Sequence, residues 1–471
     1  MRRYLLPLSA GLALASGCAH YQPRPLSPEE GLHRLEERGF PDPGLRAFME
    51  RATGSRFEAW PPARLDFEQL ALAALYFHPS LDVARAQWEV SRAAGRSAEA
   101  RPNPTVNLQP GYNFSAAGGA TPWIPGLNLD WPIETAGKRG RRIDRAAHLT
   151  EAARLGVFQA AWQIRASLRT ALLDLAAAWR RESLLERQAE ISRGLLGVLD
   201  QRLAAGAVSQ LEVAPFRTAA LKVASDLAES RRAAQEARVR VAEALGVPVQ
   251  ALGGIELGVE LGASPSVTPD PDPASAHRAA LQNRADVRAL LEEYAAAEAG
   301  VRLEIARQYP DVHLGNGYQW DQGESKWTLG IGLELPVLSR NQGPIAESIA
   351  RRGEVGARFT ALESRVLAEV DRALAARRTA REQVERAAAL LASHRRQLES
   401  LRAAFQAGGA DQLDVRTAEL EAAAAELLHL DALIRADQAL GDLQQALQAP
   451  FPGGGLLVPS APQSPASPPH P

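Results

Sequence analysis

The fold is decided at Ala205-Gly206-Ala207-Val208-Ser209-Gln210-Leu211-Glu212-Val213, where one long helical pattern stops and another starts. Gly206 supplies a residue that readily adopts a positive φ and so ends the first helix. Ser209 and Glu212 have the spacing of a capping box, which satisfies free N–H groups at the start of the second helix. The stretch therefore predicts a helical hairpin with its tip at these residues.

The same pattern returns later in the chain, as Ala407-Gly408-Gly409-Ala410-Asp411-Gln412-Leu413-Asp414-Val415. Gly408 takes the place of Gly206, and Asp411 with Asp414 forms the second capping box. The stretch from Pro310 to Tyr318 likewise aligns with the stretch from Pro104 to Tyr112. Such matches indicate an internal duplication. Each repeat reads as helix, strand hairpin, long helix, tip and helix, and we expect the two tips to form the closing end of a tube.

Hydrophobic periodicity divides the chain further, because alternation predicts strands and 3,4 spacing predicts helices. Repeat 1 is expected at 65–262, with a helical pattern at 65–100, strands at 105–114 and 123–133, and helices at 141–205 and 210–246. A Pro-rich linker at 263–276 follows. Repeat 2 is expected at 277–450, with strands at 311–320 and 327–337 and helices at 345–407 and 412–448. The segment 18–64 shows one weak helical pattern at 31–52, and a disordered tail is expected at 451–471.

The first long helix carries an apolar seam with strict 3,4 spacing, which is typical of a coiled coil. Glu182 and Ser192 are the polar residues that interrupt it. The seam consists of Ala161, Ile164, Leu168, Ala171, Leu175, Ala178, Leu185, Ala189, Leu196, Leu199 and Leu203. Because a helix rises about 1.5 Å per residue, this one is expected to be on the order of 100 Å long.

The N-terminus has the features of a secretion signal at 1–17, with a basic start at Arg2-Arg3 and a short apolar run after it. Small residues then lead into Cys18, the single cysteine of the chain, and this order resembles a bacterial lipoprotein signal. Cys18 is therefore the predicted lipidation site. The alternative is an ordinary secretory signal with an incidental cysteine.

Composition excludes several classes of function. The 471 residues are 46% hydrophobic and carry a net charge of −2, so no nucleic-acid surface is expected. No GxSxG, Walker or HExxH motif is present, and the nine histidines are scattered, so we expect neither catalysis nor a metal site nor a cofactor. Beyond the signal no apolar run approaches the roughly 18 residues of a spanning helix. Any membrane crossing would then use strands.

Four strands with one apolar and one polar face are too few to close a barrel, since the smallest membrane barrels have about eight. Open edges are not tolerated in lipid. Other copies of the chain would have to complete the wall: three copies supply about twelve strands and a wet lumen, whereas two supply about eight and a filled interior. The expected fold class is therefore an α+β membrane protein.

Aromatic residues cluster in or beside these strands, as interfacial girdles would require. The alternative is a soluble strand pair that packs its aromatic residues on a core. The girdle candidates are Tyr112, Phe114, Trp123, Trp131, Tyr318, Trp320 and Trp327.

From about Leu65 to Phe451 the chain resembles the TolC-type outer-membrane efflux protein family. The resemblance rests on His78-Pro79-Ser80-Leu81, on the tip motif and on the two-fold repeat. It implies a homotrimer with a 12-stranded β-barrel in the outer membrane and an α-helical barrel that crosses the periplasm; the signal before Cys18 adds the expected lipid anchor. It also implies a periplasmic adaptor and an inner-membrane pump of the resistance-nodulation-division type.

The run Trp131-Pro132-Ile133-Glu134-Thr135-Ala136-Gly137-Lys138-Arg139-Gly140 is similar to the outer-membrane components of cobalt–zinc–cadmium efflux systems. Repeat 2 departs from this motif with Ser339-Arg340-Asn341. The implied function is an exit duct that conducts solutes, including divalent heavy-metal cations. A multidrug or type I secretion duct, a periplasmic coiled-coil adaptor and a lipid-anchored enzyme are the alternatives.

The resemblance also suggests roles at the tips. Glu212, Asp411 and Asp414 are candidates for an acidic gate, although a second family aspartate falls at Thr417. The competing interpretation is helix capping. Candidate adaptor contacts, which turn chemistry alone also explains, are Gly206, Ser209, Leu211, Gly408, Gly409 and Leu413. A basic group after the second strand fits either lipid phosphates or a solvated bend. It comprises Lys138, Arg139, Arg141 and Arg142.

Overall fold

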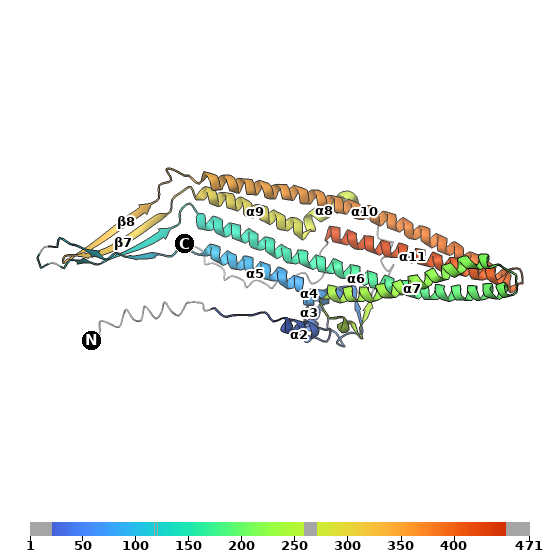
Figure 1. Cartoon of the computed structure of the whole chain (residues 1–471). Coiled ribbons are helices and arrows are strands. Elements are labelled where there is room, and N and C mark those ends of the chain that lie inside the picture. The colour runs from blue at the N-terminus through green and yellow to red at the C-terminus, as the bar shows by residue number, and fades with distance from the viewer. Residues whose placement is uncertain (1–20, 117, 120, 259–270, 449–471) are drawn as a thin grey trace.

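The structure, a computed structural model, describes residues 21–116, 118–119, 121–258 and 271–448. Cys18, the predicted tail and part of the predicted linker lie outside these residues. The molecule is elongated, with a β-sheet at one end, long helices along its length and two helical tips at the other end (Figure 1). Within the described ranges, no helix is both long enough and apolar enough to cross a membrane.

The helices follow the same order in both repeats. Repeat 1 contains α4 (Phe67–Phe77), α5 (Pro79–Glu99), α6 (Lys138–Ala204) and α7 (Gln210–Leu245). Repeat 2 contains α8 (Pro273–Asn283), α9 (Ala285–Ala306), α10 (Gln342–Gln406) and α11 (Gln412–Leu447). The single helical pattern expected at 65–100 is wrong, because it breaks where His78 is extended before Pro79.

The N-terminal segment holds two helices where one weak pattern was expected. These are α2 (Pro28–Glu36) and α3 (Pro43–Thr53), each with proline in its first turn. A short strand β1 (Arg64–Asp66) pairs in parallel with β6 (Glu256–Gly258), which follows the 3₁₀ turn η1 (Val249–Leu252). This segment packs beside the middle of the long helices (Figure 1). Its core includes Phe40, Leu45, Met49, Leu65, Leu70 and Leu81, all fully buried.

A four-stranded antiparallel sheet joins the two repeats. Its order is β2-β5-β7-β8, with β2 (Thr105–Leu108), β5 (Gly126–Ile133), β7 (Val312–Asp321) and β8 (Glu324–Leu333). The repeats meet at the β5–β7 ladder, which runs from Gly126↔Gln319 to Ile133↔Val312. Strands β2 and β8 are the two edges.

Several strand bounds differ from the expected ones. The strand expected at 123–133 is divided at Pro125, which has no N–H to donate, and the strand expected at 327–337 ends at Leu333, where the pairing with β7 ends. The strand expected at 105–114 stops at Leu108, because Pro110 lacks an N–H for the ladder, and resumes as β3 (Gly111–Tyr112), paired with β4 (Trp123–Ile124). Strand β8 begins before residue 327, because Gln322 and Gly323, with φ of 48° and 96°, make a tight two-residue turn.

The seam of α6 shifts along the helix. Its first part is buried as expected, from Ala161 to Leu185. Farther on, Gln188 and Leu195 are buried, whereas the expected Ala189, Leu196 and Leu203 are only partly buried. Leu199 is buried as expected, and so is the interrupting Ser192. A strict seam drifts around a straight helix because 3.6 residues make one turn, so the contact face moves by one position. Ser192 is therefore part of the packed face.

Candidate functional site

The sheet separates apolar from polar side chains. Directly opposed residues of neighbouring strands lie on the same face, so the register assigns each side chain. The apolar face carries Val106, Leu108, Leu127, Leu129, Trp131, Ile133, Val312, Leu314, Asn316, Tyr318, Trp320, Ser325, Trp327, Leu329, Ile331 and Leu333. The polar face carries Thr105, Asn107, Gly126, Asn128, Asp130, Pro132, His313, Gly315, Gly317, Gln319, Asp321, Glu324, Lys326, Thr328, Gly330 and Gly332. Both faces are largely open in one protomer.

The predicted girdle residues lie on this sheet and on or beside the separate two-stranded sheet of β3 and β4. Tyr112 contacts Phe114 and Trp123 edge to face, with ring centroids 4.9 and 5.1 Å apart. Tyr318 and Trp327 face each other across β7 and β8 at 4.9 Å. Trp320, whose backbone N–H donates to the Pro125 carbonyl at 3.0 Å, lies at this same outer end. Trp131 lies alone among them near the helices, so the aromatic side chains are unevenly divided between the two ends.

The basic group after β5 fastens the sheet to the helices. The Lys138 Nζ lies 2.7 Å from Asp311 Oδ1, and the Lys138 side chain is buried. Arg142 donates to Glu134 at 2.6 Å, and Arg139 donates to the Glu99 carbonyl at 2.8 Å. Arg141 lies 3.8 Å from Asp144, so all four basic side chains have partners within the protomer, which corrects the interpretation as a freely solvated bend.

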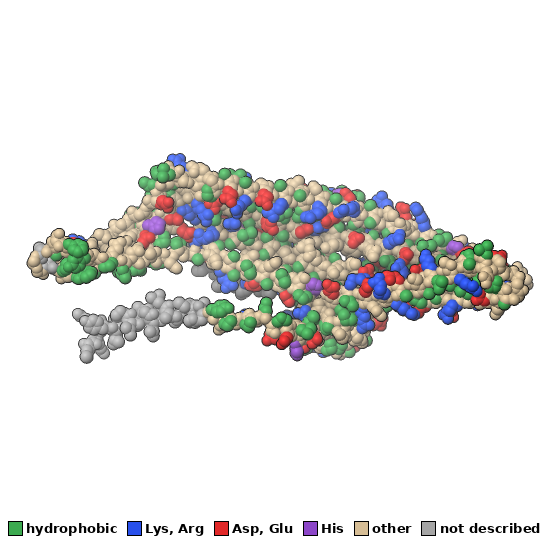
Figure 2. Space-filling model, viewed as in Figure 1, with side chains coloured by type: hydrophobic (Ala, Val, Ile, Leu, Met, Phe, Trp, Pro, Cys, Tyr) green, Lys and Arg blue, Asp and Glu red, His purple; other side chains and the backbone are tan. Residues whose placement is uncertain are grey.

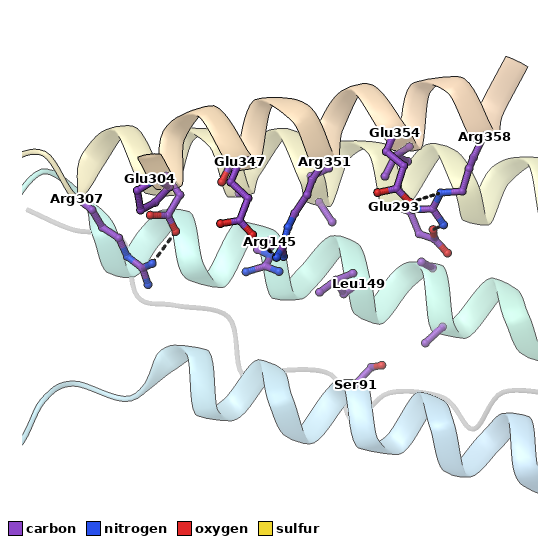
Figure 3. Close-up of a pocket in the computed structure, with 18 of the residues that line it drawn as sticks. Ser91, Arg145, Leu149, Glu293, Glu304, Arg307, Glu347, Arg351, Glu354 and Arg358 are labelled. Atoms are coloured by element: carbon purple, nitrogen blue, oxygen red, sulfur yellow. Dashed lines mark hydrogen bonds and ion pairs between the residues drawn. The ribbon is translucent and has the colours of Figure 1, made fainter. Parts of the chain in front are cut away.

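A charged groove of about 930 Å³ lies between α6, α9 and α10, with Ser91 of α5 at its edge. Its arginine and glutamate side chains alternate along the helices, and Arg145, Glu347 and Arg351 point toward one another between α6 and α10 (Figure 3). The pairs are Glu304–Arg307 at 2.6 Å, Glu347–Arg351 at 2.5 Å, Glu293–Arg358 at 3.5 Å and Glu354–Arg358 at 3.8 Å. Periodicity alone did not single out this groove, because its charges look like an ordinary solvated helix face.

At the first tip, Gly206 has φ 74° and ends α6, while Ser209 caps α7. The Glu212 carboxylate accepts from the Ser209 N–H at 2.6 Å and from its hydroxyl at 2.8 Å. The Ser209 backbone and hydroxyl hydrogen bonds lower the pKa of Glu212 below its ordinary value. Glu212 is therefore an exposed anion that also caps the helix.

At the second tip, Gly408 has φ 77°, and Asp411 and Asp414 form the corresponding capping box. The Asp414 carboxylate accepts from the Asp411 N–H at 3.1 Å. Asp411 in addition forms an ion pair with Arg202 of α6. This hydrogen bond from Arg202, followed by that from the Leu413 N–H, lowers the pKa of Asp411. The pairing with Arg202 escaped sequence reasoning, because nothing in the pattern brings α6 beside the second tip.

The predicted adaptor contacts divide into two groups. Leu211 is 83% exposed, and Gly206, Ser209 and Gly408 are also exposed. Leu413 instead packs against a small apolar cluster that holds the two tips together. That cluster is built around Leu195, Leu199 and Val213, with Leu203, Val208 and Phe216 beside them.

The part of the chain that the structure describes contains no group of three or more histidine, cysteine, aspartate or glutamate side chains able to hold a metal ion. On the polar face of the sheet, the His313 Nδ1 lies 2.9 Å from Asp130 Oδ2, which is a pair and not a group of three.

Comparison with known proteins gives two relatives. The chain is 28% identical over 223 residues to the cobalt-zinc-cadmium resistance protein CzcC of Cupriavidus metallidurans. The aligned region covers 47% of this chain and 52% of that protein. This match thus spans about half the length of CzcC. The chain is 27% identical over 364 residues to the nickel-cobalt-cadmium resistance protein NccC of Alcaligenes xylosoxydans xylosoxydans, covering 74% of this chain and 78% of that protein.

Among solved structures, the outer-membrane channel OprN superimposes with a TM-score of 0.68 at 19% identity, covering 90% of this chain and 98% of that one. This likeness concerns the fold. The family described as outer membrane efflux protein matches residues 70–247 and 277–448, which are the two repeats. The resemblance inferred from the tips is thereby confirmed, and the family is one of channels, not enzymes. The chain belongs to the outer membrane efflux protein family.

Proposed function

We propose that three copies of this chain form an exit duct in the outer membrane, with the apolar face of the sheet toward lipid and the polar face toward a water-filled lumen. The observation that carries the proposal is the sheet itself. One face is mainly apolar and the other carries the charged and most of the polar side chains, and the edge strands β2 and β8 end the ladder with unpaired backbone groups. Lipid does not tolerate such edges. Pairing β8 of one copy with β2 of the next removes them, and three copies give a closed barrel of about twelve strands.

The long helices would continue this wall as an α-helical barrel through the periplasm. Their tips would meet a periplasmic adaptor that is coupled to an inner-membrane pump of the resistance-nodulation-division type. Exposed Leu211 and the tip glycines offer the contact surface for that adaptor. Leu413 contributes by holding the two tips together.

The acidic residues of the tips would line the closed end of the tube. Asp411 is compensated by Arg202, so the negative charge of the proposed constriction comes from Glu212 and Asp414. Three copies would repeat this charge around the axis, and a ring of carboxylates favours cations over anions. Capping and gating are compatible, because each carboxylate uses one face for the backbone N–H and leaves the other to solvent.

The proposed cargo is divalent heavy-metal cations. Two relatives are named for resistance to cobalt, zinc, cadmium and nickel, and one of them matches 74% of this chain. A duct needs no metal ligands of its own to pass ions that a pump delivers. Acylation of Cys18 would add a lipid anchor at the N-terminus.

A deletion strain without a redundant system tests this proposal. Loss of tolerance to cobalt, zinc and cadmium, restored by the gene in trans, is the expected result, while tolerance to drugs stays unchanged. Unchanged metal tolerance together with lost drug tolerance would show that the duct exports drugs and not metal cations. Unchanged tolerance to both would contradict an efflux role.

A further inference from the structure

The connection between β8 and α10, residues 334–341, exposes apolar side chains that nothing in the protomer covers. Leu335, Val337 and Leu338 are 67%, 76% and 98% exposed. Hydrophobic side chains gather where β8 joins α10 (Figure 2). Isolated exposed leucines are ordinary, but adjacent exposed apolar residues indicate an interaction site.

These side chains continue the apolar face of the sheet. Along β8 that face takes every second residue up to Leu333, the last residue paired with β7. Leu335 continues this alternation one step beyond the ladder. The chain then bends, because the Val337 N–H donates to the Leu335 carbonyl at 2.8 Å, and Val337 and Leu338 are exposed on this bend. The apolar stripe therefore extends beyond Leu333, the last residue of β8.

The corresponding connection in repeat 1 has a different character. This connection, residues 134–137, is shorter than that of repeat 2. The Thr135 N–H donates to the Asp311 carboxylate at 2.9 Å. Lys138 binds the same carboxylate. In repeat 1 the apolar stripe ends inside the ladder, where Ile133 pairs with Val312. The exposed apolar connection is thus a feature of repeat 2 alone.

We infer that Leu335–Leu338 inserts among the acyl chains of the periplasmic leaflet, as an apolar foot at the inner end of the sheet. The inference rests on the proposed placement of the sheet in lipid. Lipid is the occupant, because the foot continues the lipid-facing stripe. A neighbouring copy that pairs with β8 does so through the backbone edge, in the plane of the sheet.

The two ends of the foot suit this position. Arg340 follows directly, and a cation at this level meets lipid phosphates. On the helix side, the Asn341 side-chain amide donates to the Glu304 carbonyl at 2.8 Å, which ties the start of α10 to α9. The foot is therefore held on both sides while its apolar side chains project from the protomer.

Depth-dependent quenching tests the foot. The full-length variants Leu338→Cys, Ile331→Cys and Ala136→Cys carry a bimane fluorophore and are reconstituted into vesicles of phosphatidylethanolamine and phosphatidylglycerol. Ile331, on the apolar face of β8, reports the lipid-facing sheet, and Ala136 reports the connection of repeat 1. The unsubstituted chain measures any label on Cys18. Nitroxide groups on the acyl chains quench from the lipid side, and iodide quenches from water.

The expected result is that nitroxide lipids quench position 338 as strongly as position 331 and several-fold more than position 136, with 338 protected from iodide. Quenching of 338 by iodide would place it in water and overturn the foot. Protection of 338 from both quenchers would mean that a neighbouring copy covers it, which also overturns the inference. If nitroxide lipids do not quench the bimane at position 331, the proposed placement of the sheet in lipid is wrong, and the inference about the foot is wrong as well.

Discussion

Arg202 of α6 forms an ion pair with Asp411, the N-cap residue of α11, so the tip of repeat 1 is tied directly to the tip of repeat 2. Farther along the same two helices, Arg187 lies 3.2 Å from Glu426, and Glu426 also binds Arg395 of α10 at 2.8 Å. A series of charge pairs thus holds α6 against α11 from the tip inward. Any outward movement of one tip must first separate Arg202 from Asp411.

Arg202→Gln is expected to loosen the closed tip and raise the single-channel conductance of the reconstituted protein in planar bilayers. The matched control is Arg193→Gln, which removes an exposed arginine of the same helix. It should leave the conductance unchanged. Equal conductance in the wild type and both variants would show that this ion pair does not hold the tip closed.

Acidification should have the same effect as removing Arg202. The pKa of Asp411 is lowered below its ordinary value of 3.8 by the hydrogen bond from Arg202. The stabilisation is therefore complete above pH 3.8 and is lost as the pH falls through the lowered pKa. Conductance is expected to stay flat from neutral pH down to the usual aspartate range and to rise only below it. In Asp411→Asn the conductance should already be raised at neutral pH and lack this transition.

Ser209→Ala removes the side chain that caps α7. The loss of an N-cap costs about 1 kcal/mol, and it should appear as local fraying. Hydrogen exchange at the first-turn amides of α7 is expected to speed up several-fold, while exchange at the start of α11 stays unchanged. Ser209→Asp, which keeps a capping oxygen, is the control. Unaltered exchange in Ser209→Ala would mean that this cap contributes nothing to the tip.

Lys138→Met is expected to weaken the junction between the sheet and the helices. The variant removes the hydrogen bond from Lys138 to the Asp311 carboxylate and leaves that from the Thr135 N–H. Loss of a hydrogen bond to a charged group costs about 1.5–3 kcal/mol. Thermal unfolding in detergent measures the loss. The double variant Lys138→Met with Asp311→Asn should recover part of it, and full additivity of the two changes would deny the coupling.

The two faces of β8 should respond in opposite ways to a charge. Ile331→Lys places an ammonium group on the proposed lipid face, which costs roughly 2–4 kcal/mol near the bilayer midplane. Thr328→Lys places it on the polar face of the same strand, where water can solvate it. The amount of assembled protein in outer-membrane fractions is expected to fall for the first variant only. Equal yields would contradict a lipid-facing apolar side.

Much of this architecture could be predicted because it follows local rules. The tip glycines and capping boxes mark the helix ends, and alternating polarity marks the strands around Leu129 and Leu314. The internal duplication supplied each of these patterns twice, so each prediction rested on two stretches of sequence. What escaped was non-local: the pairing of β5 with β7, the three-residue partnership of β1 with β6, and the ion pair of Arg202 all depend on which segments become neighbours.

Two local signals were present but were read incompletely. Pro110 should have divided the first strand, because it cannot donate to a ladder. Asp321-Gln322-Gly323-Glu324 should have indicated a two-residue hairpin turn, since Gly323 readily adopts a positive φ. The seam of α6 was predicted correctly except at Ala189, Leu196 and Leu203, because its register there depends on how the helix packs against α7, α9 and α11, which no spacing rule contains.

The central claim is that three copies of the chain together complete one wall in the membrane. Native mass spectrometry of the detergent-solubilised, full-length protein counts the chains in each particle directly. Three chains per particle, stable in detergent and aggregating without it, is the predicted result. A particle of one chain that remains monodisperse in buffer without detergent would contradict the account.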